Sequence, residues 1–192
     1  MTVKQKILKM CYPLFMKFGK ANHKKDTSIH ATAPVDFYSL NATLNNNTVM
    51  NFSSLKGKKV MIVNTASDCG FTAQYASLEK LYQQHKDSLV IIAFPANDFK
   101  NQEKGDDNTI ATFCKVNYGI TFPIAKKAIV VKSNDQQLVF KWLTQKSQNG
   151  WNEQAPTWNF CKYVIDEQGQ LTHFFKSSVD PLGDEMQQAL FK

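Results

Sequence analysis

The most constraining feature of this 192-residue sequence is a pair of strongly apolar segments joined by one amphipathic segment. Residues 60–66 (VMIVNTA) and 89–94 (LVIIAF) have the length and composition of buried β-strands. Between them, from about residue 72 to 85, apolar side chains recur at helical spacing. Two strands joined by one helix run parallel in one sheet, normally with a right-handed crossover. The sequence therefore predicts an α/β fold with a βαβ unit near its centre.

Segments around this unit add further strands and helices. Residues 160–165 and 171–175 flank a turn of sequence DEQG, so they predict an antiparallel hairpin. Residues 34–40 and 48–52 flank three asparagines, which predicts an N-terminal hairpin. We expect a mixed central sheet flanked by helices, which is the thioredoxin-like arrangement. The other expected elements are helices near 108–118, 138–146 and 184–191 and a short strand at 128–131.

The excess positive charge lies in the N-terminal segment. The formal net charge is +7, residues 1–25 contain no acid, and later lysines are balanced by acids. Because the chain has no arginine for bidentate base contacts, we do not expect nucleic-acid binding. We expect residues 1–33 to form a basic extension and residues 34–192 to form one domain. The lysines of the segment are Lys4, Lys6, Lys9, Lys17, Lys20, Lys24 and Lys25.

Residues 1–25 permit three interpretations. Apolar residues at helical spacing among lysines are typical of a helix that rests on an anionic membrane, although Pro13 interrupts the pattern. A secretion signal is the second interpretation, but the apolar run is short and no cleavage site follows closely. The third is an extension that packs on the domain. We expect a cytoplasmic location, with peripheral membrane or export as alternatives. The apolar residues are Ile7, Met10, Cys11, Leu14, Phe15 and Phe18.

Cys69 is the candidate nucleophile among the four cysteines of the chain. No C-x-x-C pair exists, so a dithiol or zinc motif is excluded, and no histidine spacing suggests a metal site. Cys69 follows a central strand and precedes a helix, whose unpaired N–H groups favour a thiolate. Asp68 opposes the thiolate by like-charge repulsion. We expect an accessible Cys69 with a lowered pKa, and we expect Cys11 to be a bystander.

Three sequence blocks resemble those of glutathione peroxidases. Residues 64–72 (NTASDCGFT) resemble the family signature N-x-A-S-x-[U/C]-G-x-T. Residues 94–103 (FPANDFKNQE) resemble F-P-C-N-Q-F-x-x-Q-E, and residues 158–163 (WNFCKY) resemble W-N-F-x-K-[FY]. The resemblance implies reduction of hydrogen peroxide and of organic or lipid hydroperoxides, through a sulfenic acid on the cysteine. It implies a catalytic tetrad of Cys69, Gln102, Trp158 and Asn159.

The residue types of this tetrad suit the reaction. Peroxide cleavage requires a sulfur nucleophile and hydrogen-bond donors for the charge that develops on the departing oxygen. An indole N–H and carboxamide NH₂ groups are donors that carry no charge. No bound cofactor is expected, and the reducing co-substrate is glutathione or thioredoxin. A slow or non-enzymatic peroxide sensor with the same fold is the alternative function.

The chain departs from the family at the position of the usual second cysteine, which is Ala96. An external thiol such as glutathione can attack the sulfenic acid directly, thioredoxin can reduce it, or another cysteine can substitute. Cys161 is the substitute to test, because we expect it on the same strand face as Asn159. We expect Cys114 on the apolar side of a helix, where it forms part of the protein core.

Further departures concern the reductant, the substrate and the oligomeric state. Phe174 stands where many members carry an arginine that helps to hold glutathione, which weakens that assignment. We expect a modest effect of Asp98, which replaces a glutamine. The short segment between Trp142 and Trp158 resembles monomeric members that act on phospholipid hydroperoxides. We therefore expect a monomer, with possible contact between the N-terminal segment and membranes.

Overall fold

The computed structural model describes residues 2–3, 5–7, 10–12, 23–25 and 32–191. The predictions that concern Pro13, Leu14, Phe15 and Phe18 lie outside these residues. The domain boundary after residue 33 and the cytoplasmic location stay predictions. Across the described parts of the chain, no helix combines the length and the apolar character needed to cross a bilayer.

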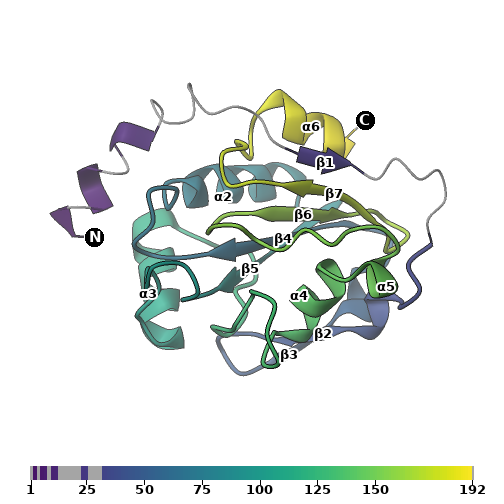
Figure 1. Cartoon of the computed structure of the whole chain (residues 1–192). Coiled ribbons are helices and arrows are strands. Elements are labelled where there is room, and N and C mark those ends of the chain that lie inside the picture. The colour runs from purple at the N-terminus through teal and green to yellow at the C-terminus, as the bar shows by residue number, and fades with distance from the viewer. Residues whose placement is uncertain (1, 4, 8–9, 13–22, 26–31, 192) are drawn as a thin grey trace.

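A five-stranded mixed sheet in the order β1-β7-β6-β4-β5 forms the centre of the molecule (Figure 1). β4 (Lys59–Thr65) and β5 (Leu89–Pro95) are parallel and are joined through α2 (Gln74–His85), as the apolar pattern predicts. β6 (Lys162–Ile165) and β7 (Leu171–Phe175) form the expected antiparallel hairpin, and β6 also pairs with β4. The carboxyl end of β4 therefore lies between β5 and β6, and these neighbours fix the start of the segment that follows β4.

Alternate side chains of β4 enter two separate hydrophobic cores, one on each face of the sheet. Met61 and Val63 belong to one core, and Val60 and Ile62 belong to the other. A strand that is buried on both faces requires a continuous apolar sequence, which residues 60–66 provide. The first core contains residues of α2, α3 (Asp107–Tyr118) and α6 (Asp184–Phe191), and the second contains residues of α4 (Leu138–Leu143).

The N-terminal hairpin is present but shorter than expected. It consists of β2 (Asn41–Thr43) and β3 (Val49–Asn51). Phe37–Ser39, expected in its first strand, form a 3₁₀ turn because the Asp36 carboxylate accepts a 2.9 Å hydrogen bond from the Tyr38 N–H. A second 3₁₀ turn, Phe52–Leu55, follows β3.

The strand expected at residues 128–131 does not occur in the described fold. The Asp98 carboxylate accepts hydrogen bonds from the backbone N–H groups of Val130 (2.7 Å) and Val131 (3.3 Å). These donors are therefore taken by a side chain instead of a neighbouring strand. Asp98, for which we expected a modest effect, thus holds this segment against the end of β5.

Other element boundaries also differ from the expectation. The helix expected at 138–146 divides into α4 and α5 (Lys146–Asn149), because the Thr144 hydroxyl donates to the Phe140 carbonyl (2.8 Å) at the end of α4. β6 begins at residue 162 instead of 160, since Phe160 has a φ of 67° and cannot continue a strand. The short β1 (His23–Lys25), which pairs with β7, was not predicted.

Candidate active site

Cys69 lies in the segment between β4 and α2. The Thr72 hydroxyl organises this segment: it accepts a hydrogen bond from the Cys69 N–H (3.0 Å) and lies 2.7 Å from the Cys69 carbonyl. The same oxygen lies 3.0 Å from the Ala66 carbonyl at the end of the strand. Because one side chain contacts both ends of the segment, the chain turns back sharply and fixes the position of the sulfur.

The structure corrects two expectations about Cys69. Its side chain is 1% exposed, where we expected an accessible thiol. Burial raises the pKa of the Cys69 thiol above its ordinary value, where we expected a lowered pKa. The helix begins at Gln74 instead of Thr72, and the N–H groups of these two residues bond the carbonyls of Phe71 and Cys69. These groups are therefore not available to stabilise a thiolate.

Hydrogen-bond donors near the sulfur oppose the effect of burial on the pKa of Cys69. The Phe71 N–H donates to the Cys69 sulfur at 3.4 Å. This N–H and the donor groups of the Trp158 and Asn159 side chains lower the pKa of the Cys69 thiol in part. The nearby Asp68 carboxylate raises it. The sulfur is thus a buried thiol with donors already directed at it, and these donors favour the thiolate.

Two hydrogen bonds connect Gln102 to this group, one at its side chain and one at its backbone carbonyl. The Asn159 side-chain amide donates to the Gln102 side-chain oxygen at 2.9 Å. The Asp68 N–H donates to the Gln102 carbonyl at 3.0 Å, which ties the Cys69 and Gln102 segments together. The structure therefore brings together all four residues that the family resemblance singles out, from three separate parts of the chain.

Asn64 on β4 holds the segment that carries Trp158 and Asn159. Its side-chain amide donates to the Trp158 carbonyl (3.0 Å), and its side-chain oxygen accepts from the Cys161 N–H (3.0 Å). Its carbonyl accepts from the Phe160 N–H at 2.6 Å. These contacts hold Phe160 in its left-handed conformation and direct Asn159 toward the side of the sheet that carries Cys69.

Sequence reasoning gave no role to Asn64, Thr72 or the pair Ser67 and Glu103. The Glu103 carboxylate accepts a 3.0 Å hydrogen bond from the Ser67 hydroxyl, two residues before Cys69. Glu103 is buried, and this burial raises its pKa to about 7. All four residues lie inside the blocks that carry the family resemblance, so the motif itself was the signal. The side chains of these four residues form the hydrogen bonds that shape the loops around Cys69.

The other cysteines do not extend this site. Cys161 is buried in the core on the face of the sheet opposite to that of Cys69, together with Ala96. Its sulfur lies 3.6 Å from the Ser177 hydroxyl. The expectation that Cys161 shares a strand face with Asn159 is wrong, because the left-handed Phe160 lies between them outside the strand. Cys114 is fully buried in α3, as expected, and all four cysteines are free.

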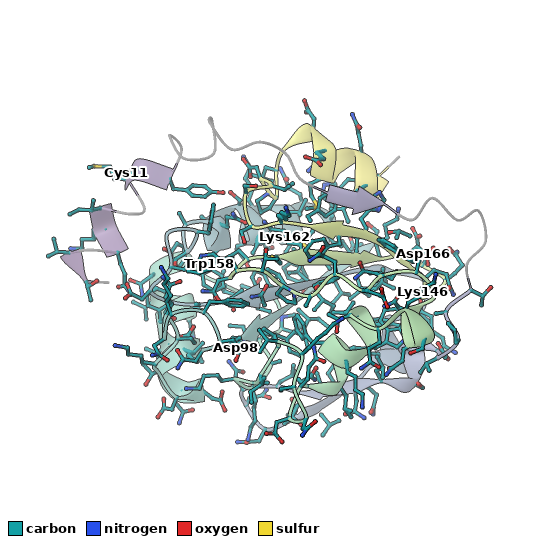
Figure 2. The ribbon with its side chains drawn as sticks, viewed as in Figure 1. Cys11, Asp98, Lys146, Trp158, Lys162 and Asp166 are labelled. Carbon is teal, nitrogen blue, oxygen red and sulfur yellow. The ribbon has the colours of Figure 1, made fainter. Side chains whose placement is uncertain are left out.

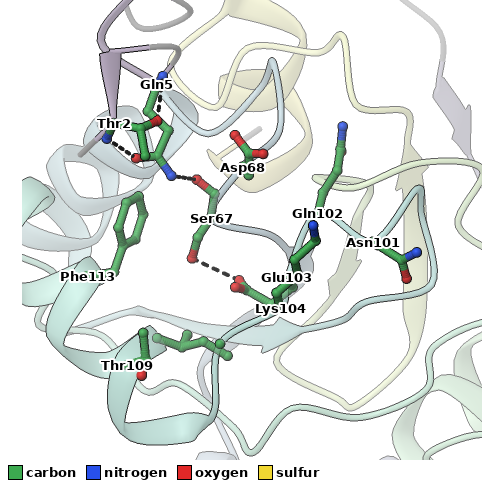
Figure 3. A pocket seen from close by; sticks show the side chains of 12 residues that line it. Thr2, Gln5, Ser67, Asp68, Asn101, Gln102, Glu103, Lys104, Thr109 and Phe113 are labelled. Carbon is green, nitrogen blue, oxygen red and sulfur yellow. Dashed lines mark hydrogen bonds between the residues drawn. The ribbon is translucent and has the colours of Figure 1, made fainter.

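A pocket of about 280 Å³ lies beside the catalytic segments (Figure 3). Ser67, Asp68 and Glu103 form one wall, and Phe113 of α3 forms another. Gln5 of the N-terminal segment closes a further side and donates to the Ser67 carbonyl at 2.8 Å. In Figure 3 the Gln102 side chain points away from this space. The pocket thus adjoins the Cys69 segment without opening on the sulfur.

Aromatic and cationic side chains surround Trp158. The Phe99 ring centroid lies 5.9 Å from that of Trp158, and the Lys100 ammonium lies 5.7 Å above the Trp158 ring. Trp158 is half-buried and Lys100 is exposed, so a positive charge lies beside the indole. Figure 2 shows Cys11 well separated from Trp158. Among the described residues, no three His, Cys, Asp or Glu side chains gather as metal ligands.

A family model described as glutathione peroxidase matches residues 37–144, more than half of the chain. The chain belongs to the glutathione peroxidase family. Its membership identifies it as a peroxidase-type oxidoreductase. The match covers Cys69 and Gln102, while Trp158 and Asn159 lie beyond it and are joined to the site by the geometry described above.

Two curated relatives match this family member over most of its length. It is 44% identical over 158 residues to the glutathione peroxidase-like peroxiredoxin GPX5 of Chlamydomonas reinhardtii, covering 81% of this chain and 96% of the relative. It is 48% identical over 132 residues to the glutathione peroxidase-like peroxiredoxin gpx1 of Schizosaccharomyces pombe, covering 68% of this chain and 82% of the relative.

Solved structures confirm the thioredoxin-like fold of this glutathione peroxidase. The crystal structure of Trgpx in its apo form is 31% identical and superposes with a TM-score of 0.61 over 82% of this chain and 97% of the other. A thioredoxin family protein from Chlorobium tepidum is 13% identical, with a TM-score of 0.59 over 86% of this chain and 100% of the other. The second likeness concerns the fold alone.

Proposed function

We propose that this chain reduces hydrogen peroxide and organic or lipid hydroperoxides at Cys69, and that glutathione or thioredoxin then regenerates the thiol. The observation that carries the proposal is the group of donors around one sulfur. The Phe71 N–H donates to the Cys69 sulfur, the donor groups of Trp158 and Asn159 lower the pKa of the thiol, and Asn159 also holds Gln102. Donors that are fixed in place before the reaction stabilise developing charge without reorganisation.

The proposed reaction balances as a two-electron transfer. The Cys69 sulfur attacks one peroxide oxygen, the S–O bond forms, and the O–O bond breaks. The departing oxygen takes up a proton and leaves as water or an alcohol, while the sulfur becomes a sulfenic acid. Trp158 and the two amides donate only through neutral N–H groups, so they stabilise charge without becoming acids themselves. The thiol proton balances the proton gained by the departing oxygen.

We propose that an external thiol attacks the sulfenic acid. The Ala96 side chain carries no sulfur, and Cys161 lies in the core on the other face of the sheet. A disulfide requires Cα atoms within about 7 Å and side chains that point toward each other. The thiol of glutathione or of thioredoxin forms a mixed disulfide with Cys69 and releases water, and a second thiol then releases Cys69.

We propose that the substrates include bulky peroxides and that the enzyme is a monomer. The segment between Trp142 and Trp158 is short, as in the monomeric relatives that the sequence resembles. Trp158 itself is half-buried, so one side of the catalytic group faces solvent. This exposure supports the access of organic hydroperoxides whose remainder stays outside the site.

A peroxide-consumption assay with each reductant supplied separately tests the proposal. Glutathione with glutathione reductase, or thioredoxin with thioredoxin reductase, should support many turnovers of wild-type protein, and Cys69→Ser should support none with either donor. The donor that sustains turnover identifies the class of reductant that the protein can use. One turnover per protein with both donors would contradict the proposal and indicate a peroxide sensor.

Two further variants test the recycling step. Cys161→Ser and Cys114→Ser should retain turnover with the active donor, because Cys161 lies in the core on the other face of the sheet and Cys114 is fully buried in α3. Loss of thioredoxin-supported turnover in Cys161→Ser, with normal sulfenic acid formation on Cys69, would show that Cys161 resolves the sulfenic acid.

A further inference from the structure

The described residues among 2–12 contact the domain on one side of the N-terminal segment. Residues 3, 5–7 and 10–12 are helical and lie outside the compact part of the molecule (Figure 1). The Gln5 side-chain amide donates to the Ser67 carbonyl at 2.8 Å (Figure 3). Tyr12 is 8% exposed, and its burial and the charge of Asp180 raise its pKa. Gln5 and Tyr12 therefore form the inner side of the segment.

The outer side of the segment consists of exposed apolar side chains. Val3 is 75% exposed, Ile7 is 52% exposed and Met10 is 76% exposed. Gln5 contacts the domain and Tyr12 is buried, whereas these three side chains face solvent. The apolar stripe thus points away from the domain, where no described residue covers it.

The positive charge of the N-terminal segment limits which kinds of surface the apolar stripe can bind. Residues 1–25 contain seven lysines and no acid, and one of them, Lys6, is exposed next to Ile7. An apolar stripe flanked by lysines matches an anionic lipid surface, where apolar groups enter the acyl boundary and lysines contact headgroups. A second copy of this segment would bring like charges together, which disfavours self-association.

We propose that the segment docks on anionic membranes through Val3, Ile7 and Met10, and so holds the Cys69 segment at the lipid surface. Ser67, which Gln5 contacts, is two residues before Cys69. The stripe is therefore linked to the Cys69 segment through the Gln5–Ser67 hydrogen bond. The proposed membrane contact is inferred from the exposed apolar side chains and the lysines of the segment. The use of lipid hydroperoxides as substrates also rests on the proposed function.

Vesicle co-sedimentation tests the docking. The full chain is mixed with vesicles of phosphatidylcholine alone or with one third phosphatidylglycerol. The test variant is Val3→Gln/Ile7→Gln/Met10→Gln, because glutamine preserves helix propensity. The matched control is Val49→Gln/Val116→Gln/Leu138→Gln, which removes apolar side chains of similar exposure (58%, 76% and 66%) elsewhere.

We expect wild type and the control to bind anionic vesicles and to bind neutral vesicles much more weakly. The test variant should lose about tenfold or more in partition coefficient, and salt at about 0.5 M should weaken wild-type binding. Equal binding by wild type and the test variant would overturn the proposal. So would concentration-dependent dimerisation of wild type that the test variant abolishes, since the stripe would then be an interface between copies.

Activity measurements separate this proposal from the proposed function. Wild type and the test variant should reduce hydrogen peroxide in solution at equal rates, because Val3, Ile7 and Met10 face solvent on the outer side of the segment. The test variant should be several-fold slower on phospholipid hydroperoxide within anionic vesicles. If neither protein reduces any peroxide, the proposed function fails while the vesicle-binding result still stands. If both reduce vesicle hydroperoxide equally, the docking has no role in substrate access.

Discussion

The side-chain amide of Asn159 donates a 2.9 Å hydrogen bond to the side-chain oxygen of Gln102, across 57 positions of sequence. This bond uses the Gln102 oxygen, so the NH₂ group of Gln102 remains available as a donor. The Asn159 oxygen is buried and accepts no hydrogen bond from the described residues. The pair can therefore offer two donors and one acceptor to a peroxide, whose hydroxyl is both acceptor and donor.

The Gln102 and Asn159 amides should act as a unit. Gln102→Ala and Asn159→Ala should each lower the second-order rate constant of Cys69 oxidation by about 10- to 1,000-fold, as expected for the loss of a preorganised donor. Since each holds the other, the double variant should lose less than the product of the single losses. Stopped-flow oxidation kinetics measure this, with Gln188→Ala on the exposed side of α6 as the control. Strict additivity would contradict the coupling.

A substitution of Trp158 can remove the indole N–H while an aromatic ring is kept at this position. Trp158→Phe should lower the rate of Cys69 oxidation by about 100-fold, because a phenyl ring fills similar space but donates no hydrogen bond. Trp151→Phe is the matched control, since Trp151 donates its N–H to the Leu171 carbonyl away from the site. The control should lose about 1 kcal/mol of stability and retain its oxidation rate. Equal oxidation rates for wild type and Trp158→Phe would exclude a role for the indole N–H.

Glu103 should make stability fall as the pH rises. Its pKa is raised from 4.5 to about 7 by burial, so the folded state binds its proton more tightly than the unfolded state. Between these values the unfolded state ionises first, and stability is lost with increasing pH. From pH 5 to 8 this loss amounts to about 2 kcal/mol. Urea unfolding of Glu103→Gln should lack this loss, whereas exposed Glu153→Gln should behave like wild type.

Lys162 should have the opposite effect at higher pH. It is fully buried, donates to the Val179 carbonyl at 2.7 Å, and has a pKa lowered by desolvation from 10.5 to about 7. Between these values the unfolded state binds the extra proton, so the folded state gains stability as the pH rises. Relative to Lys162→Met, wild type should gain about 2 kcal/mol between pH 7 and 9. Lys141→Met, an exposed change on α4, should show the wild-type pH dependence. Parallel profiles for wild type and Lys162→Met would contradict a neutral buried amine.

The predictable part of the fold comes from local patterns. The apolar runs of β4 and β5 reflect burial on both faces, and their single connecting helix requires a parallel pair. α6 has the predicted bounds because its first turn is acidic and its apolar residues keep helical spacing. The four site residues could be named because three motif blocks fix their identities.

The features that sequence reasoning missed depend on distant contacts. The Asp98 carboxylate displaces the strand expected after residue 127. The left-handed Phe160 sends Cys161 to the opposite core, and hydrogen bonds from Asn64 on β4 create that geometry. The burial of Cys69 depends on side chains from three segments, so its raised pKa could not be derived from its place before a helix.

The most direct test of the central claim is the site and stoichiometry of oxidation by one equivalent of hydroperoxide. The reduced protein is treated, trapped with a sulfenic acid reagent such as dimedone, digested and analysed by mass spectrometry. The account predicts one adduct per chain on Cys69, with none formed by Cys69→Ser and unreacted Cys114 and Cys161. Equal peroxide consumption by Cys69→Ser, or an adduct mainly on another cysteine, would contradict it.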